Sequence, residues 1–397
     1  MKHVLPYALF EASATTPALT QEQIEWLAKC VSNHTGRWKL NPQTGLADIN
    51  GVFYCNYKGL TDFKGVRFGK VSGGFHCYNN HLTTLEGAPQ TIEGNFHCYL
   101  NNLTTLEGAP QQVSGDFKCN NNQLTSLMGA PQTVGAGFFC DNNQLTTLEG
   151  APQSVWGFYC GGNQLTSLEG APQEVEDFYC ADNQLTTLVG APQTVGKDFY
   201  CEDNQLTSLE GAPQSVGGNF SCENNELTTL VGAPQSVGES FDCENNQLTS
   251  LEGAPLKVGG SFYCGDNQLT SLEGAPQSVG GNFSCENNEL TTLEGAPQSV
   301  GGSFDCSSNQ LTSLEGAPQS VKGGFYCGGN PVSESTLKAI FELMKKGMGY
   351  QQALEQRWPK MKDKDRVLMY KQMPSLSPED VRKYKALATY ANIKNYL

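Results

Sequence analysis

The stretch Val216–Gln235, VGGNFSCENNELTTLVGAPQ, is one copy of a unit that repeats along the middle of the chain. All of the 15 cysteines except Cys30 belong to this unit, and from Cys55 to Cys327 they follow one another at intervals of 20 to 22 residues. A fixed period of this size is typical of a solenoid, in which each coil packs on its two neighbours. The repeat therefore predicts an elongated array of coils.

The shortest copy, Val155–Leu165, has the spacing V-x-x-F-x-C-x-x-N-x-L, which is the leucine-rich-repeat frame with Phe and Cys in two of the leucine positions. Phe158 and Cys160 are two residues apart, so on a strand both side chains point to one face and Tyr159 points to the other. One such strand per coil predicts a parallel sheet with one buried face. Asn163 follows at the turn, where we expect its amide to satisfy backbone groups left unpaired by the bend.

The second half of the coil, Leu165–Pro172, adds two leucines and then Gly-Ala-Pro. Proline fixes φ and disfavours helical geometry at the preceding residue, so we expect an extended or polyproline-like convex side. Most copies hold an extra residue, usually glycine, between Val and Phe, which we interpret as a loosened bend. The copies that end at Cys160 and Cys180 lack it, so we expect the path of the solenoid to change there. The predicted fold is a β-solenoid of leucine-rich-repeat type with a curved parallel β-sheet.

The unit resembles the short bacterial leucine-rich repeat of type III secreted effectors, whose coils read L-x-x-L-x-V-x-x-N-x-L-x-x-L-P-x-L-P. Leu165, Leu168 and Pro172 match the second half of that repeat, whereas Gly170-Ala171 replaces its apolar-proline step. Tandem copies with Phe, Cys and Gly-Ala-Pro are also similar to repeat proteins encoded by large tailed phages. The resemblance covers roughly residues 51–330 and implies a fold, which by itself carries no function.

We divide the chain into an N-terminal arm or targeting segment (1–18), an N-terminal cap (19–50), the solenoid (51–330) and a basic helical C-terminal cap (331–397). In the first cap, Thr20–Cys30 begins with a capping-box pattern and predicts a helix. Trp38–Ile49 predicts a hairpin with its turn at Asn-Pro and Gly. Beyond Pro331, Ser333 is a good N-cap for the first of several amphipathic helices. Both caps would cover the open apolar ends of the array.

Residues 1–18 have a basic start and a short apolar run, which leaves three interpretations. A signal peptide would be cut near Ala12–Ala14, but its apolar core is short and holds a proline. The segment also resembles the capsid-targeting segment of internal head proteins of large tailed phages, which is cut after a triplet such as Leu9–Glu11. The third interpretation is a short arm that docks by its apolar face.

The chain carries a net charge of −15, which divides into +3 for residues 1–70, −24 for residues 71–330 and +6 for residues 331–397. An acidic solenoid repels phosphates, so direct binding of duplex nucleic acid by the repeats is excluded. The charge either keeps the array soluble or attracts a basic partner. The basic C-terminal segment can also dock to an acidic partner or to nucleic acid. No stretch reaches the roughly 18 apolar residues of a membrane span, so we expect no membrane partner.

The cysteine ladder predicts buried free thiols. Stacked cysteines have Cβ atoms about 4.8 Å apart, whereas a disulfide requires about 3.8 Å. Free thiols imply folding in a reducing compartment, which disfavours the signal peptide. Cys30 lies outside the ladder, and only His34 is near enough in sequence to serve as its base. No cysteine follows Cys327, so the ubiquitin-ligase activity of some effectors is not implied. The turn Glu202–Asn204 lacks a calcium-repeat pattern. We therefore expect no catalytic residue, cofactor or metal.

The exposed face of the sheet is the remaining candidate site. The residue between Phe and Cys points to this face and gives a column of Tyr54, His76, His97, Lys118, Phe139, Tyr159, Tyr179, Tyr200, Ser221, Asp242, Tyr263, Ser284, Asp305 and Tyr326. Phe139, Tyr159, Tyr179 and Tyr200 form a predicted concave patch for a partner, flanked by Asp141, Glu202, Glu223 and Glu244. The alternative is that aromatic residues are there only for their β-propensity.

These observations predict a non-enzymatic protein-binding or assembly scaffold, encoded by a phage and associated with its virion as a structural or internal head protein. It would fold in the reducing cytoplasm of the host. The alternative is a bacterial effector or surface protein that recognises a host factor through its concave face and resides in the bacterial cytoplasm before secretion. The partners are other proteins, and the oligomeric state is left open.

Overall fold

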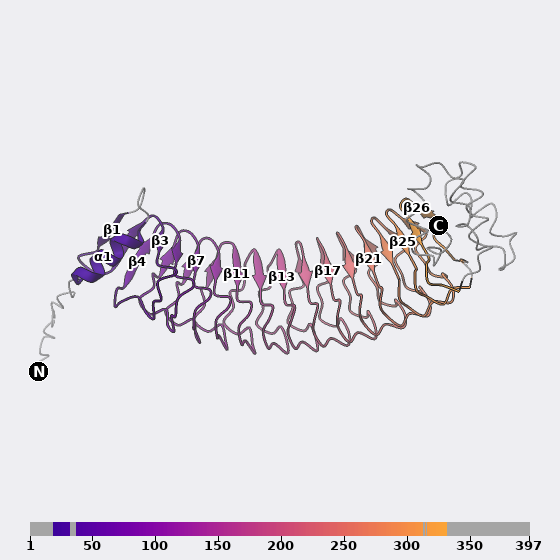
Figure 1. Cartoon of the computed structure of the whole chain (residues 1–397), viewed down its shortest axis with the longest axis horizontal. Helices are drawn as coiled ribbons and strands as arrows, with labels where there is room; N and C mark the ends of the chain where they lie inside the picture. Colours follow the sequence, from indigo (N-terminus) through magenta and orange to yellow (C-terminus); the bar gives the residue numbers. More distant parts are fainter. Residues whose placement is uncertain (1–18, 32–36, 313, 315, 332–397) are drawn as a thin grey trace, which may run out of the picture.

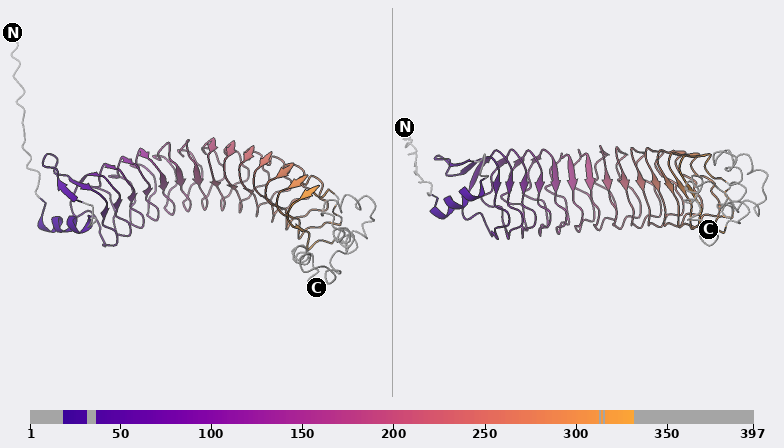
Figure 2. Two further views of the ribbon diagram at one scale, coloured as in Figure 1. Left: turned by 90° about the horizontal axis from the view of Figure 1, so that it is seen from above. Right: turned by 45° about the horizontal axis from the view of Figure 1, so that its top comes forward.

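The computed structural model describes residues 19–31, 37–312, 314 and 316–331. Over these residues the chain forms a long, arched stack of coils, with the strands of one sheet along the inner side of the arch (Figure 1). Two further views show the coils stacked one after another along the whole array (Figure 2). The segment 1–18 and the helices expected after Pro331 lie outside the described residues. A parallel β-solenoid with a concave sheet is thus confirmed.

The main sheet has 14 strands, and their order follows the chain. All its strands are parallel, and phenylalanine pairs with phenylalanine at every step. They are β3 (Phe53–Tyr54), β5 (Phe75–His76), β7 (Phe96–His97), β9 (Phe117–Lys118), β11 (Gly137–Phe139), β12 (Gly157–Tyr159), β13 (Asp177–Tyr179), β15 (Phe199–Tyr200), β17 (Phe220–Ser221), β19 (Phe241–Asp242), β21 (Phe262–Tyr263), β23 (Phe283–Ser284), β25 (Phe304–Asp305) and β27 (Phe325–Tyr326). The Phe-x-Cys segments therefore form one continuous sheet, as predicted.

Side sheets, which the sequence did not predict, run beside the main sheet. The first has six strands: β1 (Arg37–Leu40), β2 (Ala47–Asn50), β4 (Phe68–Val71), β6 (Thr91–Ile92), β8 (Gln112–Val113) and β10 (Thr133–Val134). The second has seven: β14 (Thr194–Val195), β16 (Ser215–Val216), β18 (Ser236–Val237), β20 (Lys257–Val258), β22 (Ser278–Val279), β24 (Ser299–Val300) and β26 (Ser320–Val321). Between them, at the two shortest coils, only the bridge Ser154–Glu174 remains, so the backbone path changes there.

The interpretation of the extra glycine as a loosened bend is wrong. Gly217 and Gly238 lie directly over one another at the corner between the two sheets, and a Cβ on Gly238 would collide with the carbonyl of Gly217. Glycine is required because successive coils approach each other closely at this corner. The bend is therefore tight, and its extra residue leaves room for a second strand in each coil.

The outer side of each coil is extended and turns at Gly-Ala-Pro. Ala88 N donates to Leu85 O at 2.9 Å, and Gly87 has a φ of 89°. These values fit a type II turn, which requires positive φ at its third residue. The described residues from 51 to 330 contain no helix, so the expected extended convex side is confirmed.

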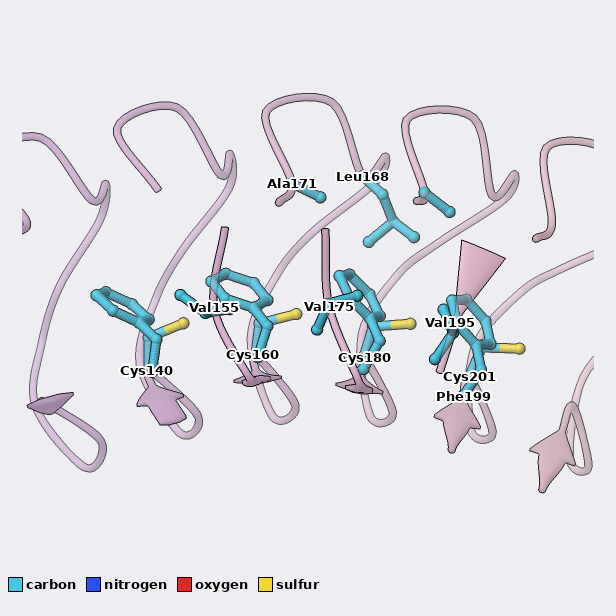
Figure 3. Close-up of a cluster of buried hydrophobic side chains, with 14 of the residues drawn as sticks. Cys140, Val155, Cys160, Leu168, Ala171, Val175, Cys180, Val195, Phe199 and Cys201 are labelled. Carbon is cyan, nitrogen blue, oxygen red and sulfur yellow. The ribbon is translucent and has the colours of Figure 1, made fainter. Parts of the chain in front are cut away.

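The core is a single column of stacked side chains that runs through the array. Phe220 has no exposed surface, and its ring centroid lies 5.3 Å from that of Phe199 and 5.4 Å from that of Phe241. Cysteine, valine and two leucines also contribute to each layer. The thiols of successive coils point the same way along the stack, as at Cys160 and Cys180 (Figure 3). Each coil buries its apolar face only through its neighbours, so neighbouring coils stabilise one another.

Asparagine joins each coil to the one before it. Asn225 Nδ2 donates to the carbonyl of Cys222 at 3.2 Å in its own coil and to that of Cys201 at 3.1 Å in the preceding coil. Its Oδ1 accepts from Leu206 N at 3.0 Å. The predicted pairing of the turn amide is confirmed, and it links two coils.

The N-terminal helix and hairpin pack on the first coil, as expected. Helix α1 (Gln21–Cys30) has both bonds of the capping box: Gln23 N donates to Thr20 Oγ1 at 3.2 Å, and Thr20 N donates to Gln23 Oε1 at 2.8 Å. Trp26 is buried, with its ring centroid 5.5 Å from that of Phe53. Strands β1 and β2 form the antiparallel hairpin. These elements cover the apolar end of the array.

Candidate binding face

The four aromatic residues of the predicted patch form one continuous stack on the concave face. Strands β11, β12, β13 and β15 hold Phe139, Tyr159, Tyr179 and Tyr200 side by side, opposite the buried phenylalanines. Successive ring centroids are 4.3, 4.8 and 4.7 Å apart, and all four side chains are half-buried. Lys118 Nζ covers the free end of the stack, 4.1 Å from the centroid of the Phe139 ring. The rings thus present their edges along the concave face.

A row of carboxylates that the sequence analysis missed borders these rings. Asp177 and Asp198 precede the buried phenylalanines and point to the same face as the tyrosines. Their Oδ1 atoms accept from the backbone N–H of the next coil, at 3.3 Å from Asp198 N and 2.8 Å from Asn219 N. Burial, with these carboxylates nearby, raises the pKa of Tyr159. The signal was present in the sequence, since a residue two positions before the tyrosine must share its face.

Three of the predicted acidic residues lie on adjacent coils beyond the tyrosine stack. Glu202, Glu223 and Glu244 each follow the cysteine that comes directly after β15, β17 and β19. Asp141 is not brought together with them, because Gly161 and Ala181 occupy its position in the intervening coils. The three glutamates and the aromatic stack meet at Tyr200.

Glu202 and Glu223 border a shallow hollow of about 350 Å³. Its walls include Tyr200, Tyr263, Glu202, Glu223 and Asp242, so two tyrosines stand at opposite ends of an acidic surface. Oxygens of Glu223, Asp242 and Glu244 lie within 4.8 Å of one another. Glu202 Oε2 is buried without a hydrogen-bond partner. This part of the face therefore concentrates negative charge.

Burial and repulsion from neighbouring carboxylates raise the pKa values of Glu202, Asp242 and Glu244. Burial, reinforced by Glu223, raises the pKa of Glu202 to about 7. Burial and then Asp242 raise the pKa of Glu244 to about 7, and burial raises that of Asp242 to about 6. None of the ion pairs among the described residues reaches this cluster. A cation supplied from outside would therefore relieve the repulsion.

These raised pKa values predict that the solenoid loses stability as the pH rises through about 4.5 to 7. In that range the folded state binds more protons than the unfolded state, and the folded state alone keeps the like charges together. We expect a lower urea midpoint at about pH 8 than at about pH 5. Glu202→Gln should reduce the difference, whereas Glu252→Gln on the outer side should preserve it. A midpoint that rises over this range, or an unchanged difference in Glu202→Gln, would contradict the assignment.

The cysteines are structural. All 15 are free and buried, and Cys222 Sγ donates to Asp242 O at 3.2 Å. Burial raises the pKa of Cys222 well above its usual value and that of Cys30 to about 11. A nucleophilic cysteine requires a lowered pKa, so Cys30 is poorly suited to catalysis, and its suggested base His34 lies outside the described residues.

Thiol titration of the denatured, unreduced chain should therefore find close to 15 thiols. The expected result follows from the parallel stacking of the cysteines along the array, which leaves every thiol buried and free. If fewer than about half of the cysteines were found as free thiols, the assignment of the stacked cysteines as reduced would be wrong.

The stacked coils, the concave parallel sheet and the Asn ladder define a leucine-rich-repeat solenoid. No protein-family model and no curated protein matches the chain. Among solved structures it is similar to YopM from Yersinia enterocolitica WA-314, with a TM-score of 0.57 and 24% identity over 71% of this chain and 61% of that one. The APL1 leucine-rich repeat domain matches with a TM-score of 0.50 and 14% identity, over 74% of this chain and 90% of that one. YopM from Yersinia pestis, a leucine-rich effector protein, matches with a TM-score of 0.47 and 22% identity, over 65% of this chain and 77% of that one.

Proposed function

We propose that this chain is a non-enzymatic protein-binding scaffold that holds a basic partner surface on its concave face. One observation carries the proposal: half-buried tyrosines stacked between two sets of carboxylates. Aromatic side chains are the usual anchors of protein interfaces, and guanidinium and ammonium groups bind both to rings and to carboxylates. The leucine-rich-repeat fold, which generally serves protein binding, supports the same role.

The stack and the acidic hollow supply different parts of the recognition. The edges of Tyr159 and Tyr179 offer apolar area with little entropy to lose, because stacking already holds the rings. Glu202, Glu223 and Asp242 attract lysine or arginine, and they set the approach rate and its salt dependence. The partner side chain that enters the hollow between Tyr200 and Tyr263 is therefore cationic.

The double substitution Tyr159→Ala with Tyr179→Ala should weaken association by about 2 kcal/mol or more, the order expected when interface anchors are truncated. The measurement is calorimetric titration with the partner purified from the virion or host, at two salt concentrations. Circular dichroism checks that the variant is folded. Tyr57→Ala, which removes a tyrosine that is 65% exposed outside the stack, is the matched control. If the folded double variant bound the partner with unchanged affinity, the binding site would not include the aromatic stack.

We place the scaffold in a phage virion, as a structural or internal head protein folded in the reducing host cytoplasm. The virion role is supported by the Phe, Cys and Gly-Ala-Pro residues that the repeats share with repeat proteins of large tailed phages. The triplet Leu9–Glu11, which resembles a capsid-targeting cleavage site, supports it as well, and the free thiols support folding in a reducing cytoplasm. The alternative is a bacterial effector or surface protein that recognises a host factor, which the matches at Leu165, Leu168 and Pro172 favour. Mass spectrometry of purified virions tests the choice. Absence of the chain from the particles would eliminate the virion role, and secretion genes beside its gene would support the effector.

A further inference from the structure

Two histidines lie in contact at the N-terminal end of the concave face. His76 of β5 and His97 of β7 are register partners on neighbouring strands. Their Nδ1 atoms are 2.9 Å apart, and their ring centroids are separated by 4.6 Å at an interplanar angle of 63°. Both side chains are half-buried. The two imidazoles therefore place the same ring nitrogen, Nδ1, side by side.

The backbone leaves space for the rings. A Cβ on Gly74 would lie 2.7 Å from Nε2 of His76, so glycine at this position gives the imidazole room. On the opposite side, the next residue of the column, Lys118, points away: its Nζ lies over Phe139 and 3.7 Å from Asp116 Oδ2. The ammonium group of Lys118 is thus directed toward Phe139 and Asp116 and away from the histidine pair.

Hydrogen bonding alone does not satisfy this pair. One Nδ1 donates to the other, yet His97 Nε2 is buried without a partner. Buried polar groups in native proteins are nearly always paired, so an exception calls for a function. The pair therefore holds one imidazole nitrogen, His97 Nε2, whose hydrogen-bonding capacity is unused.

We propose that His76 and His97 form a binding site for a divalent transition-metal ion, held by the two Nδ1 atoms. Metal–nitrogen bonds of about 2.0–2.1 Å to atoms 2.9 Å apart subtend an angle of about 90°. That angle suits square-planar or octahedral ions, whereas tetrahedral Zn²⁺ requires nitrogens about 3.3 Å apart. The geometry therefore favours Cu²⁺ or Ni²⁺, which also bind imidazole more tightly than the earlier divalent metals.

Metal binding requires only a change of tautomer at one ring. The proton of the donating Nδ1 moves to Nε2, so each Nδ1 presents a lone pair and no net proton is lost. His97 Nε2 lacks an acceptor with or without the metal, so binding creates no new unsatisfied group. The remaining ligands of such an ion would come from water or from a side chain of a bound partner. This proposal differs from the expectation of no metal in the sequence analysis. The two ligands are 21 residues apart in sequence, so no metal-binding motif indicated them.

The test is calorimetric titration of the untagged, full-length chain with NiCl₂, with Cu²⁺ electron paramagnetic resonance as the second readout. All proteins carry His3→Gln, because a free amino terminus with histidine third in the chain is itself a Cu²⁺ and Ni²⁺ chelate. We expect one Ni²⁺ per chain and a Cu²⁺ spectrum with coupling to two imidazole nitrogens. His76→Gln and His97→Gln should each weaken binding by about tenfold or more.

His81→Gln is the matched control, since His81 is an exposed histidine close to the pair and outside it. It should bind Ni²⁺ like the parent protein. Circular dichroism verifies that each variant is folded. The proposal is overturned if the parent binds no Ni²⁺, if all three variants bind equally, or if the Cu²⁺ spectrum lacks nitrogen coupling that depends on His76 and His97.

Discussion

Phe220→Ala should lower the free energy of unfolding by about 3–5 kcal/mol, the range found when a fully buried phenylalanine is truncated. Phe220 is completely buried and stacks on both neighbouring phenylalanines, so alanine leaves a cavity that the rigid column cannot close. Urea denaturation of the full chain, followed by circular dichroism, measures the loss.

The same substitution tests the one-dimensional character of the array. Because each coil contacts only its neighbours, hydrogen exchange should accelerate most in the coils that hold Phe199, Phe220 and Phe241, and little at β5. Phe220→Leu, which keeps most of the volume, should cost clearly less. A loss below about 1 kcal/mol in Phe220→Ala would contradict a continuous aromatic core.

Asn225→Ala should cost about 2–4 kcal/mol of stability. It leaves the buried N–H of Leu206 without its acceptor and removes the side-chain donors to two cysteine carbonyls. The cost is limited because Cys222 O still accepts from Asn246 Nδ2 at 3.0 Å. The same urea experiment measures the change.

Asn224→Gly is the control for this prediction. Asn224 is the exposed neighbour, with a φ of 52°, a conformation that glycine adopts without strain. Its replacement should leave stability nearly unchanged. Equal losses in the two variants would mean that the buried amide has no special role in joining the coils.

Much of the fold could be predicted because the same alternation of buried and exposed positions recurs in every copy of the repeat. Phe158 and Cys160 fix one strand face in each coil, and Asn163 marks its end. The side sheets could not be predicted in this way, since a two-residue strand such as Ser215–Val216 shows no alternation. The glycine that follows this strand was interpreted as part of a loosened bend, whereas glycine is required there because successive coils approach each other closely.

The candidate site shows the same division. The aromatic stack from Phe139 to Tyr200 followed from the column between Phe and Cys, since parallel strands in register place equal positions side by side. Asp177 and Asp198 were missed because exposed residues were sought only at the position between Phe and Cys, and both aspartates lie two positions before it. The contact of His76 with His97 was implicit in the column, but the separation of their Nδ1 atoms depends on rotamers that the sequence does not give.

The most direct test of the concave-face account is photocrosslinking in cells that produce the chain from its native gene. p-Benzoylphenylalanine replaces Tyr179 in one protein and Leu256, which is 76% exposed on the return side of its coil, in the other. We predict a covalent adduct at position 179 with one protein that carries a basic surface, weakened at high salt and absent at position 256. An adduct at position 256 with none at position 179 would contradict recognition through the concave face.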